Sequence, residues 1–499
     1  MSAFSNLADG FVVSLSLVNV AYCFLGVLLG TMIGVLPGLG PITTIALLLP
    51  LTVTLDPTTA LIMLAGIYYG AQYGGSTTSI LMNVPGESSA VVTAIDGHQM
   101  ARQGRAGVAL AVAAIGSFVA GTIATFFIAF LAPPLTALAL EFGPPEYFSL
   151  MVLGLVSAVA LASGSMLKAV AMLTMGLLLG LTGRDIYSGL PRFTFGSSSL
   201  LDGIDFVALA VGIFGLSEIL RNLENNVTRQ VLTQKISNLM PSREDIRRIV
   251  GPILRGTGLG ALLGILPGGG AVLSSFVSYM VEKRVSRHPE QFSKGAIEGV
   301  AGPESANNAG AQTSFIPMLT LGIPSNPVMA LMIGAFIMQG IMPGPNVISS
   351  RPELFWGLIT SMWIGNVLLL VLNLPLVGLW VRLLSIPYNI IVPIVLVFST
   401  VGVYCTGQNA FQVVLLALFS LLGYLFVKSD CEPAPLILGF ILGPLLEEHF
   451  RRSMIVGRGD LTIFLAHPLS AVTLALAIAM IVIASLPKTQ AKREEVFTD

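Results

Sequence analysis

Long apolar runs alternate with short polar loops along most of the chain. Apolar windows begin near Phe11, Ala106, Phe148, Met166, Phe206, Leu354, Ile390, Phe411 and Leu461. These windows hold about 18 to 25 residues, and a helix needs about 20 to cross the ~30 Å hydrocarbon core of a bilayer. Strands of a membrane barrel would instead show short runs of alternating polarity. The pattern therefore predicts an all-α polytopic protein that crosses the lipid bilayer many times.

The composition agrees with this prediction. Of the 499 residues, 54% are hydrophobic and 10% are charged, and the mean hydropathy is +0.85. One water-soluble core could not bury so much apolar surface. The net charge is −1 and the basic residues are scattered among loops, so nothing indicates a nucleic-acid partner. The N-terminal "MSAFSNLADG" has no basic segment, so we expect no cleaved signal peptide.

A polar stretch from Arg221 to Arg248 divides the apolar sequence into halves that share landmarks in the same order. The paired landmarks are "GVLPGLG" from Gly34 and "GILPGGG" from Gly264, "GAQ" from Gly70 and from Gly310, and "NVPGESS" from Asn83 and "GIPSNPV" from Gly322. Ordered matches of this kind indicate an internal duplication. We predict a first membrane repeat at residues 1–220, a polar cytoplasmic linker at 221–250 and a second membrane repeat at 251–499.

Loop charges predict that the two repeats are inverted relative to each other. The loop after the second PGxG motif carries Lys283, Arg284, Arg287 and Lys294, whereas its counterpart "LTVTLDPTTA" has no basic residue. Lys and Arg near the ends of spans favour the cytoplasm. Equivalent loops are therefore expected on opposite sides of the membrane, as in inverted-topology repeats.

The segment from Gly251 to Val281 is too short to cross the membrane twice, because two spans need about 40 apolar residues. Both of its flanks are predicted to be cytoplasmic. We therefore expect a re-entrant hairpin with Pro267–Gly270 at its tip. Symmetry predicts a matching tip at Pro37–Gly40, reached from the other face.

Proline and glycine at these tips predict broken helices inside the membrane. Irregular backbone is tolerated there only where protein buries it or where it lines a wet cavity. A half-helix N-terminus offers N–H groups to an anion, and a C-terminus offers carbonyl groups to a cation. The tips therefore indicate a binding site, with a simple packing kink as the alternative.

Two tracts, Tyr68–Ser89 and Gly302–Pro327, place many amides and hydroxyls among apolar residues. The substrate-binding residues predicted from the tips and tracts are Gly38, Asn83, Pro85, Gly86, Glu87, Ser88, Gly268, Pro324, Ser325 and Asn326. The residues predicted to bind Na⁺ are Gly40, Thr77, Gly270, Asn307, Asn308 and Thr313. The alternative for each is a helix contact made by small and polar residues. Glu87 and Glu304 are open to two interpretations, a cation-coupling acid or a helix cap.

No catalytic site is predicted, and we do not expect an enzyme. The sequence has neither an HExxH pair nor a "GK" dipeptide, which argues against a zinc protease and a nucleotide-binding P-loop. An intramembrane protease would have to use His467, and a passive anion channel is the other alternative. No cofactor is expected apart from Na⁺ as a coupling ion.

The sequence resembles the large membrane subunit (TctA) of the tripartite tricarboxylate transporter family. The similarity runs through "GVLPGLGP", "YGGSTTSILMNVPGESSAVVTAIDGHQMARQGRAGVAL", "GILPGGGA" and "GPESANNAGAQTSFIPMLTLGIPSNP". It implies a secondary transporter of the bacterial inner membrane that imports organic tri- and dicarboxylates by Na⁺ symport. It also implies two partners, a small membrane subunit and a periplasmic solute-binding protein that delivers substrate. We expect alternating access and, by analogy with other hairpin-bearing inverted repeats, an elevator motion in a homodimer.

Overall fold

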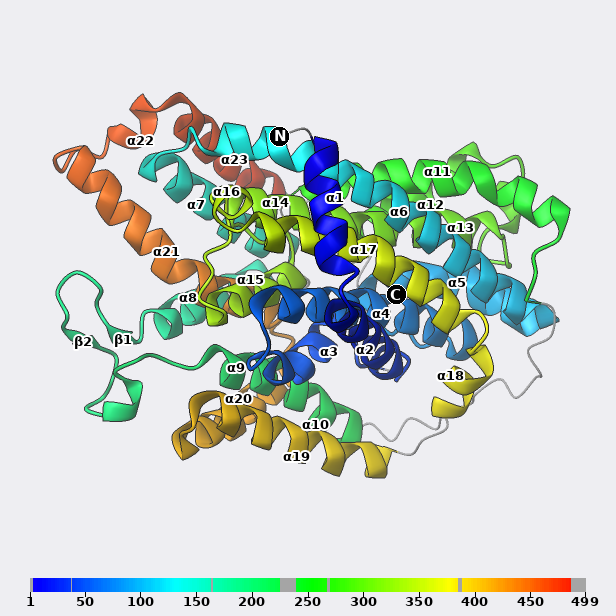
Figure 1. Ribbon diagram of the computed structural model, residues 1–499, viewed down its shortest axis with the longest axis horizontal. Coiled ribbons are helices and arrows are strands. Elements are labelled where there is room, and N and C mark those ends of the chain that lie inside the picture. Colours follow the sequence, from blue (N-terminus) through cyan, green and yellow to red (C-terminus); the bar gives the residue numbers. More distant parts are fainter. Residues whose placement is uncertain are drawn as a thin grey trace.

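The computed structural model describes residues 3–36, 38–162, 165–224, 239–266, 270–384 and 388–485, and these are almost entirely helical (Figure 1). The helices before the linker are α1 (Ala3–Ser14), α2 (Leu17–Gly34), α3 (Pro41–Leu48), α4 (Pro57–Met82), α5 (Val91–Met100), α6 (Ala106–Ala139), α7 (Pro144–Leu161), α8 (Met166–Gly180), α9 (Phe206–Ala210) and α10 (Ser217–Glu224). Strands β1 (Gly183–Arg184) and β2 (Pro191–Arg192) form a small antiparallel pair between α8 and α9.

The helices after the linker are α11 (Arg243–Ile265), α12 (Gly270–Val285), α13 (Glu298–Thr313), α14 (Phe315–Leu321), α15 (Pro327–Met338), α16 (Val347–Ser350), α17 (Pro352–Asn373), α18 (Val377–Leu383), α19 (Tyr388–Gly407), α20 (Ala410–Lys428), α21 (Ala434–Val456), α22 (Ile463–Ala466) and α23 (Pro468–Ser485). Pro37 and the residues 267–269, which include the predicted site residue Gly268, lie outside the described residues. Residues 225–238 of the predicted linker lie outside them as well.

Seven helical segments of the described chain are long and apolar enough to cross a membrane: Leu17–Gly34, Ser88–Ala139, Phe206–Glu224, Pro352–Asn373, Ile390–Gly407, Ala410–Lys428 and Pro468–Ser485. This confirms the prediction of an all-α, multi-pass membrane protein. The apolar window near Phe11 is divided between α1 and α2, and the window near Leu461 becomes a long helix only from Pro468. The windows near Phe148 and Met166 form shorter apolar helices.

Several helix ends follow from residues visible in the sequence. Asp56 accepts a hydrogen bond from the backbone N–H of Thr58 at the start of α4, and Pro57 is the first helical residue. Ser242 and Asp245 form a capping box at the start of α11. A side-chain oxygen satisfies N–H groups that have no partner in the first helical turn, and the fixed φ of proline suits the first helical position.

Two helix pairs pack closely through glycine. Gly26, Gly30 and Gly34 of α2 lie against the backbone of Met63, Ile67 and Ala71 of α4, and Gly256, Gly260 and Gly264 of α11 lie against Gly302, Ala306 and Gly310 of α13. A Cβ added to Gly30 would lie 2.3 Å from the carbonyl oxygen of Ile67, and one added to Gly260 would lie 2.3 Å from that of Ala306. Small residues allow such close backbone approach. In both pairs the residue numbers of the contacting positions increase in the same direction along the two helices, so the paired helices are parallel.

The molecule has two ends, which we call the strand end and the linker end. Strands β1 and β2 mark the strand end, at the left of Figure 1. There Arg192 forms an ion pair with Glu447 of α21. The start of α11, after the linker, marks the linker end at the right, where Asp245 pairs with Arg105 just before α6.

The two glycine-packed pairs begin at opposite ends of the molecule. Helix α6 starts at the linker end, and α17 runs antiparallel to it, because Trp363 bonds to the carbonyl of Thr122 while Asn366 bonds to that of Phe118. Helix α4 starts beside the start of α17, where a Cβ on Gly357 would lie 3.5 Å from a side-chain carbon of Thr58. Helices α2 and α4 therefore run from the strand end, whereas α11 and α13 run from the linker end (Figure 1).

We predict that Gly260→Ala lowers the melting temperature of the detergent-purified protein, because the added methyl meets backbone that must move. Overpacking of this kind costs about 1 to 3 kcal/mol. Gly258→Ala in the same helix is the matched control, since nothing lies within 4 Å of an added Cβ there. That variant should be neutral or slightly stabilised, because alanine is the better helix former. Equal melting temperatures for both variants would contradict this account of the packing.

Candidate functional site

The two predicted polar tracts form the same backbone turn in both halves. Asn83 (φ 55°) ends α4 and Gly322 (φ 72°) ends α14, both in the left-handed conformation that terminates helices. Four residues later, extended Glu87 (φ −148°) and Asn326 (φ −157°) precede the next helical segments, the 3₁₀ turn Ser88–Ala90 and α15. We call these turns break 1 (residues 83–88) and break 2 (residues 322–326). They contain the predicted site residues Pro85 and Pro324 respectively.

The last glycine of each PGxG motif lies against the break of its own half. A Cβ on Gly40 would lie 3.0 Å from the carbonyl oxygen of Gly86 in break 1. A Cβ on Gly270, whose φ is 49°, would lie 3.3 Å from Cβ of Asn326 in break 2. Gly38 is placed differently, because its nearest neighbour is the side chain of Asn222 in α10. Each half therefore brings two irregular backbone segments together.

Helix α13 connects the two breaks. Asn307 donates a hydrogen bond from Nδ2 to Glu87 Oε1 at 3.0 Å, so α13 contacts break 1. One turn later, a Cβ on Gly310 would lie 3.1 Å from the carbonyl oxygen of Gly270, so the same helix reaches the segment beside break 2. Asn307 is 1% exposed, and its Oδ1 has no hydrogen-bond partner among the described residues.

Break 2 is also fixed to the end of α13. Ser325 donates to the carbonyl of Ser314, and Asn326 donates from Nδ2 to the Ser314 hydroxyl at 3.0 Å. The Asn326 Oδ1 accepts from the backbone N–H of Met329 and caps α15. In break 1, Glu87 stands before a 3₁₀ turn but makes no side-chain cap there; its carboxylate accepts from Asn307 instead. Ser88 beside it is exposed.

Glu304 is the centre of a second polar cluster. Its carboxylate accepts hydrogen bonds from Ser76 of α4, at 2.8 Å, and from Thr93 of α5. Glu304 is 1% exposed and lies inside α13, so the interpretation as a helix cap is wrong for this residue. The next residues along the cluster are Asn308 and Ser117, which are joined by a 2.6 Å hydrogen bond.

The six residues predicted to bind Na⁺ are divided among three places. Gly40, Gly270 and Asn307 lie with the breaks, whereas Thr77 and Asn308 lie in the Glu304 cluster. Thr313 packs between α11 and α13, where its hydroxyl donates to the carbonyl of Ala309. Within the described chain, no three His, Cys, Asp or Glu side chains are grouped to hold a metal ion. A cation here would therefore depend mainly on hydroxyl, amide and carbonyl oxygens.

Asp96 of α5 is a buried acid that sequence reasoning did not single out. Its carboxylate accepts from the backbone N–H groups of Gly295 and Ala296, at 2.8 and 2.9 Å, and from the hydroxyl of Tyr279 at 2.9 Å. The residue is fully buried. It therefore fastens the first half of the chain to the loop that leads into α13. The only sequence signal was a lone acid inside the mostly apolar run "VVTAID".

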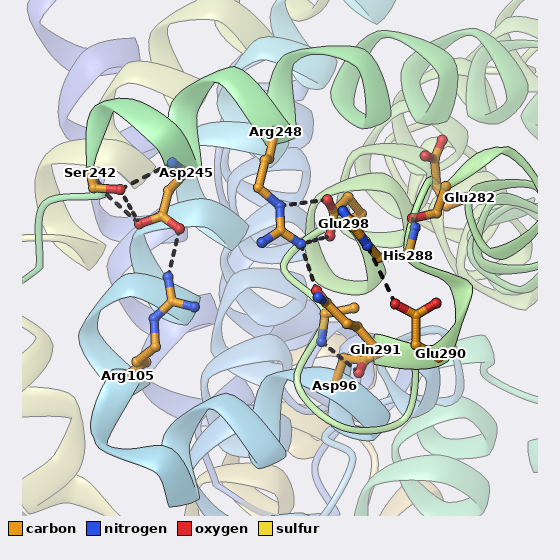
Figure 2. A network of polar contacts seen from close by, with 12 residues as sticks. Asp96, Arg105, Ser242, Asp245, Arg248, Glu282, His288, Glu290, Gln291 and Glu298 are labelled. Carbon is orange, nitrogen blue, oxygen red and sulfur yellow. Dashed lines mark hydrogen bonds and ion pairs between the residues drawn. The ribbon is translucent and has the colours of Figure 1, made fainter.

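Ion pairs join α11 to α13 at the linker end (Figure 2) and also join α11 to α12. Arg248 of α11 pairs with Glu298 of α13 at 2.7 Å, and Arg255 pairs with buried Glu282 of α12 at 2.6 Å. Asp245 is partly desolvated, but hydrogen bonds from Ser242 and Arg105 hold its pKa below the usual range. These contacts hold the three helices together at this end of the molecule.

His467 lies 2.8 Å, through Nδ1, from the carboxylate of Glu146. The same glutamate caps α7 by accepting from the backbone N–H of Gly143. This contact indicates that the histidine has a structural role at the strand end.

Comparison with known proteins gives one family. The model of the "Tripartite tricarboxylate transporter TctA family" matches residues 20–438. The chain is 60% identical over 499 residues to an uncharacterized 52.8 kDa protein of Agrobacterium vitis from the TAR-I ttuC' 3' region, covering 100% of this chain and 99% of that protein. It is 59% identical over 240 residues to an uncharacterized Agrobacterium vitis protein from the TAR-II ttuC' 3' region, covering 48% of this chain and 99% of that protein. No solved structure matches.

We predict that Asp96→Ala destabilises the purified protein, because two backbone N–H groups and one hydroxyl lose their buried acceptor. An unsatisfied buried donor costs about 1 to 3 kcal/mol. Asp9→Ala, which alters an exposed acid in α1, is the control and should leave the melting temperature unchanged. Tyr279→Phe removes one of the three bonds and should have a smaller effect. The account is contradicted if Asp96→Ala has the same melting temperature as the wild type.

Proposed function

The chain belongs to the tripartite tricarboxylate transporter TctA family, and from that premise we propose that it imports organic di- and tricarboxylates into bacteria by Na⁺-coupled alternating access. It is a multi-pass membrane protein, and the family implies a transporter component with further subunits. The observation that carries the proposal is the pair of matching breaks, both of which contact α13. Irregular backbone inside a membrane protein is expected where it lines a binding site.

The breaks suit a carboxylate substrate. The substrate-binding residues of the two breaks include no Lys or Arg, so the anion would be held by backbone N–H groups and side-chain amides. In break 1 these groups extend from Asn83 to Ser88, and in break 2 from Pro324 to Asn326. The N-terminus of α15 adds the positive end of a helix dipole. Neutral donors of this kind can bind an anion and still release it, because no fixed positive charge holds it in place.

The breaks also give a physical reason for cation coupling. Glu87 in break 1 would repel a bound carboxylate through Coulomb interaction in a poorly solvated site. A Na⁺ ion between the two would offset this repulsion. Its oxygen ligands would be Glu87, the carbonyl groups near Gly40 and Gly270, and Oδ1 of Asn307, which has no hydrogen-bond partner among the described residues. At this site, Na⁺ and carboxylate would therefore favour each other's binding.

Alternating access would follow from inverted repeats at 1–220 and 251–499. Equivalent glycine contacts in α2–α4 and α11–α13, with opposite directions, support this duplication. The basic residues near the linker end favour the cytoplasm, so we place the linker there and the strand end in the periplasm of the inner membrane. A periplasmic binding protein would deliver substrate at the strand end. A small membrane subunit and a second copy of the chain would complete the assembly.

We expect cells that carry the whole transport system to accumulate a di- or tricarboxylate when an inward Na⁺ gradient is imposed. Replacing Na⁺ by choline should reduce uptake at least tenfold. Uptake of the same carboxylate at an equal rate with no Na⁺ gradient would instead indicate a passive anion channel.

Asn307→Ala should abolish this uptake at normal membrane abundance, because it removes the contact between α13 and Glu87 and a predicted Na⁺ ligand. Asn346→Ala, at an exposed position before α16, is the control and should transport normally. Wild-type uptake by Asn307→Ala would remove break 1 from the transport site.

A further inference from the structure

A small cavity lies where α4, α6, α13 and the end of α17 meet, and both apolar and polar side chains line it. Its volume is about 20 Å³, and a cavity needs about 10 to 15 Å³ to hold one water molecule. The polar side chains that line it are Tyr73, Ser76, Thr77, Ser117, Glu304 and Asn373. The space therefore suits one water molecule or one small dehydrated ion in contact with the oxygen atoms of these side chains.

Glu304 brings a carboxylate to this cavity without a basic partner. Ser76 and Thr93, which donate hydrogen bonds to it, are neutral hydroxyls. The ion pairs formed by the described residues do not include Glu304. A buried negative charge is costly unless a cation or proton compensates it. The acid therefore requires a positive charge that this part of the chain does not supply.

Asn373 is a second and independent sign of a ligand in the cavity. This residue is 5% exposed, and its Nδ2 donates to the carbonyl of Leu369 at 2.9 Å. Its Oδ1 is buried and accepts no hydrogen bond within the described ranges. A proton on Glu304 would neutralise the acid, and a separate water molecule would then be needed to satisfy Asn373 Oδ1. A metal cation in the cavity would compensate both groups.

We propose that this cavity is a Na⁺ site, separate from the breaks, in which Glu304 supplies the negative charge. Ser76, Thr77, Ser117 and Asn373 supply neutral oxygen ligands, the donor type that hard cations prefer. The ligands come from both halves of the chain, so the bound ion strengthens the contact between them. The role of this ion in coupling rests on the proposed transport function, but its binding does not.

The test measures melting of the detergent-purified full-length protein without any carboxylate, in NaCl and in choline chloride of equal ionic strength. Na⁺ should raise the wild-type melting temperature by a few degrees, because a ligand that binds only the folded state stabilises it. Glu304→Gln should lose this shift. Asn373→Ala should need roughly tenfold more Na⁺ for the same shift, as expected for one lost contact to a charged group.

A matched pair of variants, one test and one control, locates the effect. Ser117→Ala removes a hydroxyl that lines the cavity and should weaken the Na⁺ effect, whereas Ser305→Ala removes a buried hydroxyl of α13 that bonds to the carbonyl of Ala301 and should keep it. If Glu304→Gln does not fold, the Na⁺ titrations of Asn373→Ala and Ser117→Ala decide the question.

The proposal is overturned if Glu304→Gln keeps the full Na⁺-dependent rise in melting temperature. It is also overturned if Asn373→Ala and Ser117→Ala both need the same Na⁺ concentration as the wild type for that rise. It is also overturned if lowering the pH stabilises the wild type while Na⁺ has no effect at any pH, because the compensating cation is then a proton. A wild-type protein that shows the shift but accumulates no carboxylate would refute the proposed function and leave this site intact.

Discussion

The structure depends on one constraint, which is that backbone groups released by a broken helix must find partners in an interior with little water. The left-handed ends of α4 and α14 stop two helices at equivalent places, and extended Glu87 and Asn326 start the next segments. Each break then lies against the last glycine of a PGxG motif, and both regions contact α13. In break 2 the irregular backbone is thus buried by other irregular backbone and by amide side chains, whereas break 1 is exposed at Asn83 and Ser88. This arrangement leaves polar groups available to a ligand.

Glycine packing determines where the breaks can lie. In α2–α4 and α11–α13 the backbones approach so closely that a single methyl group would collide with a carbonyl oxygen. Such contacts fix how far one helix of each pair is shifted along the other. They therefore fix where the ends of the two helices lie relative to each other. At the linker end, Asp96 and the ion pairs of Arg248 and Arg255 add directional bonds that hold the second pair to α12 and to the first half. The polar site is therefore held by two rigid pairs that run in opposite directions.

Much of the fold could be predicted from the sequence, because apolar length and Pro-Gly breaks are local signals. The equivalence of "NVPGESS" and "GIPSNPV" predicted the two matching turns. The position of Glu304 could not be predicted this way: "GP" before it suggested a helix start, but α13 begins earlier, at Glu298, and includes Pro303. Thr93 and Asn373 were missed because each lies far from Glu304 in sequence, and only packing of α5 and α17 brings them near it. Thr313 looked like a polar site residue, yet it packs between helices.

The central claim is that the breaks line a wet, substrate-binding hollow within the membrane. It is tested most directly by thiol labelling of Ser88→Cys in a chain whose native Cys23, Cys405 and Cys431 are replaced by alanine. We predict that a water-soluble thiol reagent labels this cysteine in membrane vesicles, and that the transported carboxylate together with Na⁺ protects it. No labelling from either side of the membrane, or labelling that carboxylate and Na⁺ leave unchanged, would contradict the account.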